Sequence, residues 1–278
     1  MTALPIIDDS NYTLLLPKTG NVFEFNGPRI LGAIPPKAGP GLCAAAPGAD
    51  FPLIPRDAWP DLIRKKDREK TWLEDIVRGV IPCNDQNGLN YCHAYGTVMK
   101  AMCQRLVQYH AYVELSAESV GGPITNWRDA GADPTDDMAQ MAKYGACPAS
   151  YMDQPHSRNP SRWKAGWEQV ALDYRATDWV DGRTLGNTFD VAATMAILGA
   201  PPAAGFYWWS HYISGPYRLL DLGGRKYALR YRNNWGPAFG DDGFVDFAEG
   251  KGTPDWLFAV MQMSVIDNIK SGQWPTLV

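Results

Sequence analysis

Hydrophobic residues recur at helical spacing in the first part of the chain and form strand-like segments near its end. Over residues 92–110 the apolar positions follow the helical period, which predicts a buried helix with Asn90 as its N-cap. A second helix is predicted to start after the capping residue Asp133 and to stop at Gly145. A third is predicted over residues 189–198, where a Gly-Ala-Pro-Pro run ends the pattern.

Beyond Pro202 the pattern changes to aromatic and β-branched segments separated by turns. It predicts strands over residues 203–209, 211–222 and 225–233, the last two joined by a Gly-Gly turn that favours antiparallel pairing. Helices therefore come first and strands second, an order that favours an α+β fold with two unlike lobes. A cleft between such lobes is the natural place for a binding site.

The N-terminal residues are rich in proline, glycine and alanine. Ten of the 22 prolines fall within the first 60 residues, and residues 32–50 follow neither the helical nor the strand period. We therefore expect residues 1–50 to form an extended arm and residues 51–278 to form one domain, which agrees with a length of 278 residues. An extended segment without a core of its own commonly becomes ordered against a partner, so we expect the arm to contact a protein assembly.

Charge and composition exclude several classes of partner. The net charge is −4 and the pI is about 5.6, so no strong basic field attracts nucleic acid or an anionic membrane. No stretch approaches the roughly 20 apolar residues of a membrane-spanning helix, and the N-terminus lacks a signal-peptide pattern. We expect no nucleic-acid partner, no membrane partner and a cytoplasmic location.

Cysteine and histidine are too few for a disulfide framework or a metal centre. Five cysteines argue against a set of disulfides, because an odd number cannot be fully paired within one chain. With only four histidines and no Cys-x-x-Cys spacing, the chain offers few metal ligands. We expect neither a metal nor another cofactor.

Cys92 is the cysteine with the most informative position. At the first turn of the predicted helix, backbone N–H groups and the positive end of the helix dipole favour the thiolate. A cysteine can equally serve as a small buried hydrophobe. The interpretation as a nucleophile therefore requires a base and an oxyanion donor from elsewhere in the chain.

His211 and Asn233 are a candidate base and its partner. His211 begins one predicted strand and Asn233 ends the next, and in an antiparallel pair these two ends lie side by side. The Asn233 carbonyl can then accept a hydrogen bond from one ring nitrogen of His211 while the other nitrogen faces Cys92. Trp235 is placed to shield that bond from water.

Together these motifs resemble the papain family of cysteine peptidases. Gln86 stands six residues before Cys92, His211 heads a strand, and the run NNWG at residues 233–236 follows in the family's order. The resemblance covers residues 51–260. It implies a papain-like α+β fold with a helical left lobe, an antiparallel β-sheet as the right lobe, and the active-site cleft between them.

The resemblance also implies roles for individual residues. Cys92 would be the nucleophile, His211 the general base and acid, and Asn233 the residue that orients His211. The side chain of Gln86 and the backbone N–H of Cys92 would stabilise the oxyanion. The implied reaction is hydrolysis of a peptide or protein substrate through a thioester.

Substrate contacts are expected on the walls of the cleft. The resemblance places Gly131 and Ala132 on a glycine-rich substrate wall. We expect the loops at Tyr91 and Trp209 to shape the substrate pocket as well.

Two departures from the family pattern concern this pocket. His93 follows Cys92 where a tryptophan is usual, and Tyr212 follows His211 where a small residue is common. His93 is a second candidate base by proximity. Adjacent residues at a helix start point in different directions, however, which favours His211.

Other functions remain open on the same residues. Parts of the chain resemble papain-like proteins of bacteria and tailed phages, so one alternative is a catalytically weak or inactive papain-fold structural or binding protein of a phage particle. Its location would then be the virion rather than the cytoplasm of a bacterial host. A second alternative is a cell-wall amidase or endopeptidase, which shares the Cys-His chemistry.

Overall fold

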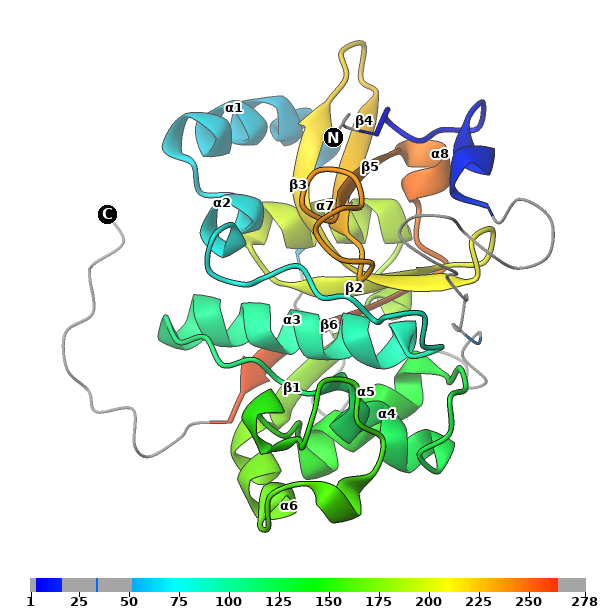
Figure 1. Ribbon diagram of the computed structural model, residues 1–278. Helices are drawn as coiled ribbons and strands as arrows, with labels where there is room; N and C mark the ends of the chain where they lie inside the picture. The colour runs from blue at the N-terminus through cyan, green and yellow to red at the C-terminus, as the bar shows by residue number, and fades with distance from the viewer. Residues whose placement is uncertain (1–3, 17–33, 35–51, 265–278) are drawn as a thin grey trace.

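The computed structural model describes residues 4–16, 34 and 52–264. Within these ranges, a mixed set of helices packs around one six-stranded antiparallel sheet with the strand order β1-β6-β2-β3-β4-β5 (Figure 1). The strands are β1 Ala176–Asp181, β2 Pro202–Phe206, β3 His211–Asp221, β4 Tyr227–Arg232, β5 Phe244–Ala248 and β6 Trp256–Met263. The α-helices are α1 Trp59–Glu69, α2 Leu73–Val77, α3 Cys92–Tyr109, α4 Ala117–Thr125, α5 Pro134–Tyr144, α6 Trp167–Ala171, α7 Thr188–Leu198 and α8 Glu249–Gly252.

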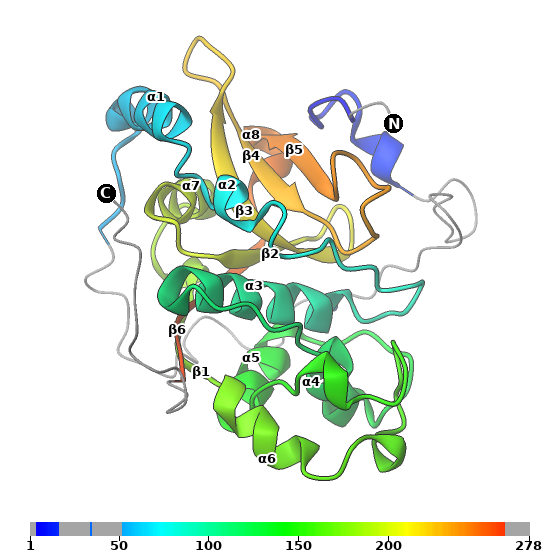
Figure 2. The ribbon, with the colours of Figure 1, turned by 60° about the vertical axis from the view of Figure 1, so that its left-hand side comes forward.

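Helix α3 is the central element of the molecule. It lies between the sheet and the helices α4 and α5, and the two ribbon views agree on this arrangement (Figures 1 and 2). Its contacts with β3 and β6 on one side and with α4 and α5 on the other explain why residues 92–106 are all buried. The helical and sheet-based lobes that the sequence predicts are therefore confirmed.

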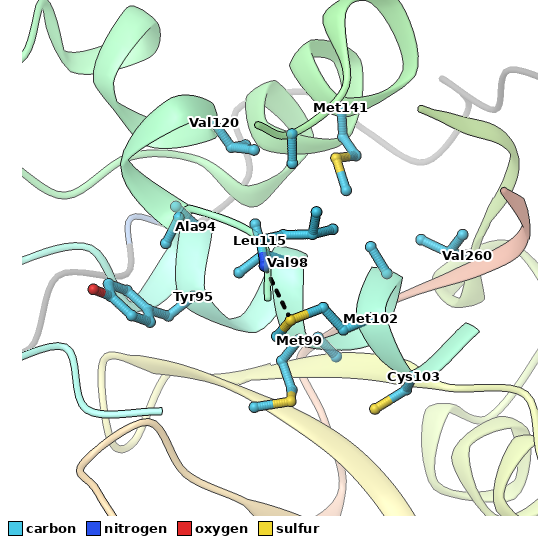
Figure 3. Close-up of a cluster of buried hydrophobic side chains, with 14 of the residues drawn as sticks. Ala94, Tyr95, Val98, Met99, Met102, Cys103, Leu115, Val120, Met141 and Val260 are labelled. Atoms are coloured by element: carbon cyan, nitrogen blue, oxygen red, sulfur yellow. Dashed lines mark hydrogen bonds between the residues drawn. The ribbon is translucent and has the colours of Figure 1, made fainter. Parts of the chain in front are cut away.

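The core is divided into layers by α3 and the sheet. One apolar cluster surrounds α3, where Met102 packs close enough to Leu115 for its sulfur to accept the Leu115 backbone N–H at 3.4 Å (Figure 3). A second cluster fills the other face of the sheet, where α1 and α7 pack against it. Because apolar side chains cover α3 on opposite sides, its first turn is held rigidly inside the protein.

The helix limits agree with the sequence predictions, apart from one N-cap. Tyr91 and not Asn90 is the N-cap residue of α3, because the helix begins at Cys92. The Asn90 backbone N–H donates to the Asp129 carboxylate at 2.7 Å. Asp133 caps α5 as predicted, because its side chain accepts the Thr135 backbone N–H.

The predicted strand over residues 203–209 is shorter in the structure. Strand β2 ends at Phe206, and residues 207–210 form a turn in which Ser210 has a φ of 50°. The turn brings His211 to the first position of β3.

Residues 4–16 of the predicted arm pack against the sheet. Ile7 accepts from the Ala248 backbone and donates to the Asp246 backbone, both at 2.8 Å, and the side chains of Ile7 and Leu15 are buried. The rest of the predicted arm, residues 1–3, 17–33 and 35–50, lies outside the described residues. None of the described helices combines the length and apolar character needed to cross a bilayer.

Candidate active site

Cys92 is the first residue of α3 and is fully buried. Its position at a helix start places it among backbone N–H groups that have no partner within the helix, at the positive end of the helix dipole. No disulfide joins any of the four cysteines in the described part of the chain. This geometry is suited to holding a thiolate.

His211 and Asn233 meet as the antiparallel pairing of their strands predicts. Strand β3 pairs with β4 in a register that puts Ser214 opposite Arg232, so the start of β3 lies beside the end of β4. The His211 Nε2 atom is 2.8 Å from the Asn233 Oδ1 atom. Both side chains are fully buried.

The same carboxamide oxygen sets the tautomer of His211. Asn233 Oδ1 also accepts the backbone N–H of Asn234 at 2.8 Å, which identifies this atom as the acceptor. His211 Nε2 must therefore carry its proton and donate it to Asn233. In the neutral ring the lone pair then lies on Nδ1, a buried atom with no hydrogen-bond partner among the described residues.

Two tryptophans enclose the His211 ring. Trp235 lies 5.0 Å from it between ring centroids, and Trp209 lies 4.6 Å from it in an edge-on arrangement. Burial lowers the pKa of His211 to about 4, while the hydrogen bond that His211 donates to Asn233 acts in the opposite direction. The isolated imidazole is therefore neutral near pH 7.

Gln86 is tied to the segment that follows Asn233. The Gln86 backbone N–H donates to the Asn234 carbonyl at 2.8 Å, and Gly236 donates to Asn84 at 2.9 Å. The Gln86 side-chain amide donates to the Leu89 carbonyl at 2.6 Å. A primary amide has two N–H donors, so a second acceptor can still be bound.

The predicted substrate wall already carries a peptide-like contact. The backbone N–H of Ile34 donates to the carbonyl of Ala132 at 3.3 Å, next to Gly131. Ile34 is part of the predicted arm and is the one described residue between residues 17 and 51. The Ala132 carbonyl is therefore oriented to pair with an extended backbone.

Tyr91 and Trp209 hold the walls from the inside. Both side chains are fully buried. The Tyr91 hydroxyl donates to the Arg128 carbonyl at 2.9 Å, and the Trp209 indole N–H donates to the Leu15 carbonyl at 3.0 Å. These two side chains therefore hold their loops in place from the interior and do not face the solvent.

His93 faces α5 in a buried ion-pair geometry. Its Nδ1 atom lies 2.9 and 2.8 Å from the two carboxylate oxygens of Asp137, and both side chains are fully buried. The sequence indicated His93 only through its position after Cys92, and it gave no indication of Asp137. A carboxylate in the first turn of a predicted helix is ordinary, because it interacts favourably with the helix dipole.

Lys100 is a second buried polar residue that the sequence analysis missed. Its ammonium donates to the Tyr212 hydroxyl at 3.0 Å, deep between α3 and β3. Burial lowers the pKa of Lys100 to about 7, and the nearby Asp137 acts in the opposite direction. The available signal was a charged residue within the apolar run of residues 92–110.

Metal ligands do not cluster in the part of the chain that the structure describes. Within residues 4–16, 34 and 52–264, no group of three or more His, Cys, Asp or Glu side chains is arranged to hold a metal ion.

Solved structures with a similar fold are papain-like cysteine proteases. Xylellain, a cysteine protease from Xylella fastidiosa, matches over 84% of this chain and 96% of its own, with 16% identity and a TM-score of 0.54. Procathepsin B S9 from Trypanosoma congolense matches over 83% and 85%, with 15% identity and a TM-score of 0.55. Bromelain from Ananas comosus, in complex with the inhibitor E64, matches over 69% and 98%, with 12% identity and a TM-score of 0.54.

At the level of sequence, no family model and no curated protein matches the chain. The structural likeness confirms the papain-like fold that the motifs predict.

Proposed function

We propose that this papain-like chain is a cysteine peptidase that hydrolyses peptide bonds with Cys92 as nucleophile and His211 as general base and acid. The proposal is carried by one observation. The His211 ring is fixed by Asn233 at 2.8 Å, and its lone-pair nitrogen Nδ1 is left without a hydrogen-bond partner among the described residues. A base prepared in this way and a cysteine at a helix start are the two parts that a thiol nucleophile requires.

The first half-reaction would transfer a proton and form a thioester. His211 Nδ1 takes the proton of the Cys92 thiol, and the sulfur attacks the carbonyl carbon of the substrate. The resulting oxyanion is stabilised by the backbone N–H of Cys92 and the second N–H of the Gln86 amide. As the tetrahedral intermediate collapses, His211 returns its proton to the leaving amine and the acyl group stays on sulfur.

The second half-reaction repeats these steps with water. His211 takes a proton from the attacking water, and the oxyanion is stabilised by the same donors. Collapse breaks the carbon–sulfur bond, and His211 returns the proton to the thiolate. Asn233 keeps the ring in one orientation through both halves of the cycle.

This chemistry creates a positive charge on His211 and a negative charge on Cys92, and both groups are buried. Because burial lowers the pKa of His211 to about 4 despite the hydrogen bond to Asn233, a lone imidazolium is unfavourable in this site. A thiolate formed at the same time on Cys92 would compensate it, since opposite charges at close range favour both ionised forms. We therefore expect proton transfer to occur as a concerted formation of the pair.

The Ala132 carbonyl supports a peptide as the substrate. It accepts the Ile34 backbone N–H at 3.3 Å, which is the hydrogen bond that an extended substrate chain would make. Main-chain pairing of this kind binds peptides with little regard to their side chains.

Thiol labelling tests the proposal directly. We expect the folded protein to gain the mass of one epoxide inhibitor, located at Cys92 by peptide mapping, and to lose activity on a fluorogenic peptide. Cys103→Ser is the matched control, because Cys103 lies on the same helix and burial raises the pKa of its thiol to about 11. An intact fold that neither reacts at Cys92 nor cleaves peptides would contradict the proposal.

One observation favours the alternative of an inactive papain-fold binding protein. Cys92, His211 and Gln86 are all fully buried, so a substrate must open the site before it reaches the sulfur. The labelling experiment separates the two functions. Digestion of purified peptidoglycan, run beside the peptide assay, tests the remaining prediction of a cell-wall amidase.

A further inference from the structure

A basic groove lies beside the loop that leads into Cys92. It is an open groove with a volume of about 590 Å³, lined by residues of two loops, at 127–129 and 154–162. Its charged and titratable residues are Arg128, Arg158, Arg162, His156 and the single carboxylate Asp129. Three guanidinium groups therefore face a common space in a chain whose net charge is −4.

Two of the three arginines have no counter-ion in the described part of the chain. Arg162 pairs with Asp153, its nitrogen lying 3.1 Å from the carboxylate. No ion pair within residues 4–16, 34 and 52–264 involves Arg128 or Arg158. The Asp129 carboxylate, which also accepts the backbone N–H of Asn90 at 2.7 Å, balances one of these charges and leaves one guanidinium charge in excess. The groove is therefore positively charged and suited to an anionic group.

The groove is joined to the candidate active site by hydrogen bonds. Asn90 and Tyr91 immediately precede Cys92, and they bind Asp129 and the Arg128 carbonyl respectively. Consecutive Cα atoms are about 3.8 Å apart, so the residues that bind Asp129 and the Arg128 carbonyl lie within about 8 Å of Cys92 along the backbone.

The same loop continues to the predicted substrate wall. Ala132, whose carbonyl accepts the Ile34 backbone N–H, follows Asp129 by three residues. The backbone of Ala132 is therefore at most about 11 Å from that of Asp129, which lines the groove. A peptide that pairs with Ala132 and continues toward Asp129 would bring its side chains to Arg128 and Arg158.

We propose that the groove binds acidic side chains of the peptide substrate, so that the enzyme prefers Asp or Glu near the cleaved bond on the side held by Ala132. This inference rests on the proposed function. Guanidinium groups form paired hydrogen bonds with carboxylates, which makes Arg the residue suited to such recognition. Continuity with the Ala132 carbonyl favours a peptide over a nucleic acid as the bearer of the charge.

Matched peptides measure the preference. Fluorogenic peptides that differ only by Glu, Gln or Lys at one position, scanned along the segment before the cleaved bond, are compared by kcat/KM. At one position we expect the kcat/KM of the Glu peptide to exceed that of the Gln peptide by about fivefold at low salt, a ratio typical of a partly exposed charge pair. The ratio should shrink as the salt concentration is raised.

Two variants separate the groove from the general charge of the protein. We expect Arg158→Gln to reduce the Glu-to-Gln ratio of kcat/KM to less than about twofold. Arg64→Gln removes an equal charge from the exposed surface of α1, and its ratio should match that of the unmodified protein. Equal ratios in the unmodified protein and Arg158→Gln would overturn the inference while leaving the peptidase intact.

A binding measurement without turnover distinguishes failure of the acidic preference from failure of the peptidase activity. The anisotropy of labelled Glu and Gln peptides is measured with Cys92→Ala, in which no cleavage can occur. We expect the Glu peptide to bind more tightly than the Gln peptide, and the added Arg158→Gln change to remove this difference. That result would support binding of acidic side chains in the groove even if the unmodified protein proved inactive. Equal binding of both peptides, or tighter binding of a single-stranded oligonucleotide than of the Glu peptide, would refute it.

Discussion

The Asn233 carboxamide oxygen lies 2.8 Å from His211 Nε2 and 2.8 Å from the backbone nitrogen of Asn234. The backbone N–H can only donate, so this oxygen is an acceptor for both groups and His211 must present its proton to it. The lone pair of the neutral ring is thereby directed to Nδ1. Asn233 thus sets both the orientation and the tautomer of the candidate base.

Removing this oxygen should slow catalysis without removing the substrate site. We expect Asn233→Ala to lower kcat by on the order of 10- to 100-fold with little change in KM, because a misoriented ring costs about that much in rate. Steady-state hydrolysis of a fluorogenic peptide measures both constants. Asn234→Ala is the control, since the Asn234 side chain is equally buried but has no hydrogen-bond partner among the described residues. An equal fall in kcat for both variants would count against a specific role for Asn233.

The buried His211 should make the protein less stable in mild acid. Its pKa falls from 6.5 to about 4 on folding because burial disfavours the charged ring, so the unfolded chain binds more protons between these values. The free energy of unfolding therefore rises with pH across this window. The contribution of His211 is lost as the pH falls toward 4. The full contribution is about 3 kcal/mol, from roughly 1.4 kcal/mol per pKa unit.

Urea unfolding between pH 4 and 7 checks this dependence. His211→Gln removes the titrating group, so we expect a flatter profile than that of the unmodified protein over the same window. His110→Asn removes an exposed imidazole and controls for the loss of one histidine. Parallel profiles for the unmodified protein and His211→Gln would show that this ring is not the source of the slope.

Breaking the His93–Asp137 pair should destabilise the helical lobe. Asp137→Asn replaces the buried carboxylate that lies 2.8 Å from His93 Nδ1 by a neutral amide, and weakening a buried hydrogen bond to a charged group typically costs about 1.5 to 3 kcal/mol. The exposed carboxylate of Asp61, which pairs with Arg64 on α1, offers a control. Asp61→Asn should cost less than about 1 kcal/mol. Similar losses for the two changes, measured by urea unfolding, would mean that the buried pair contributes no more than a surface one.

The sequence was sufficient for the elements that depend on local patterns. Helix α3, the Asp133 cap of α5 and the strand that starts at His211 follow from apolar spacing, capping chemistry and turns, and all are observed. The contact between His211 and Asn233 also follows, because antiparallel pairing relates the two ends of a hairpin.

Contacts between distant segments could not be predicted in this way. Asp137 and His93 are 44 residues apart, and neither residue's neighbours in sequence indicate that α5 packs on the first turn of α3. The partnership of Lys100 with Tyr212 joins a helix to a strand 112 residues later. The basic groove likewise forms from two loops whose approach depends on the tertiary fold.

Gly96 allows the closest approach between α3 and β3 at Tyr212. A Cβ atom at Gly96 would lie 2.7 Å from Cδ1 and 2.9 Å from Cε1 of the Tyr212 ring, and the ring is held in place by the hydrogen bond from Lys100. Gly→Ala within an exposed helix gains up to about 1 kcal/mol, but overpacking a core costs about 1 to 3 kcal/mol. We therefore expect Gly96→Ala to lower the free energy of unfolding.

A double-mutant cycle separates the steric clash from helix propensity. In a Tyr212→Leu background the ring is absent, so Gly96→Ala should become neutral or stabilising, and the two changes should be coupled by about 1 kcal/mol or more. Urea unfolding of the four proteins gives this coupling. If Gly96→Ala instead stabilises the unmodified protein, the Tyr212 ring must be able to move aside. The close packing of β3 against α3 would then not be the reason for a glycine at position 96.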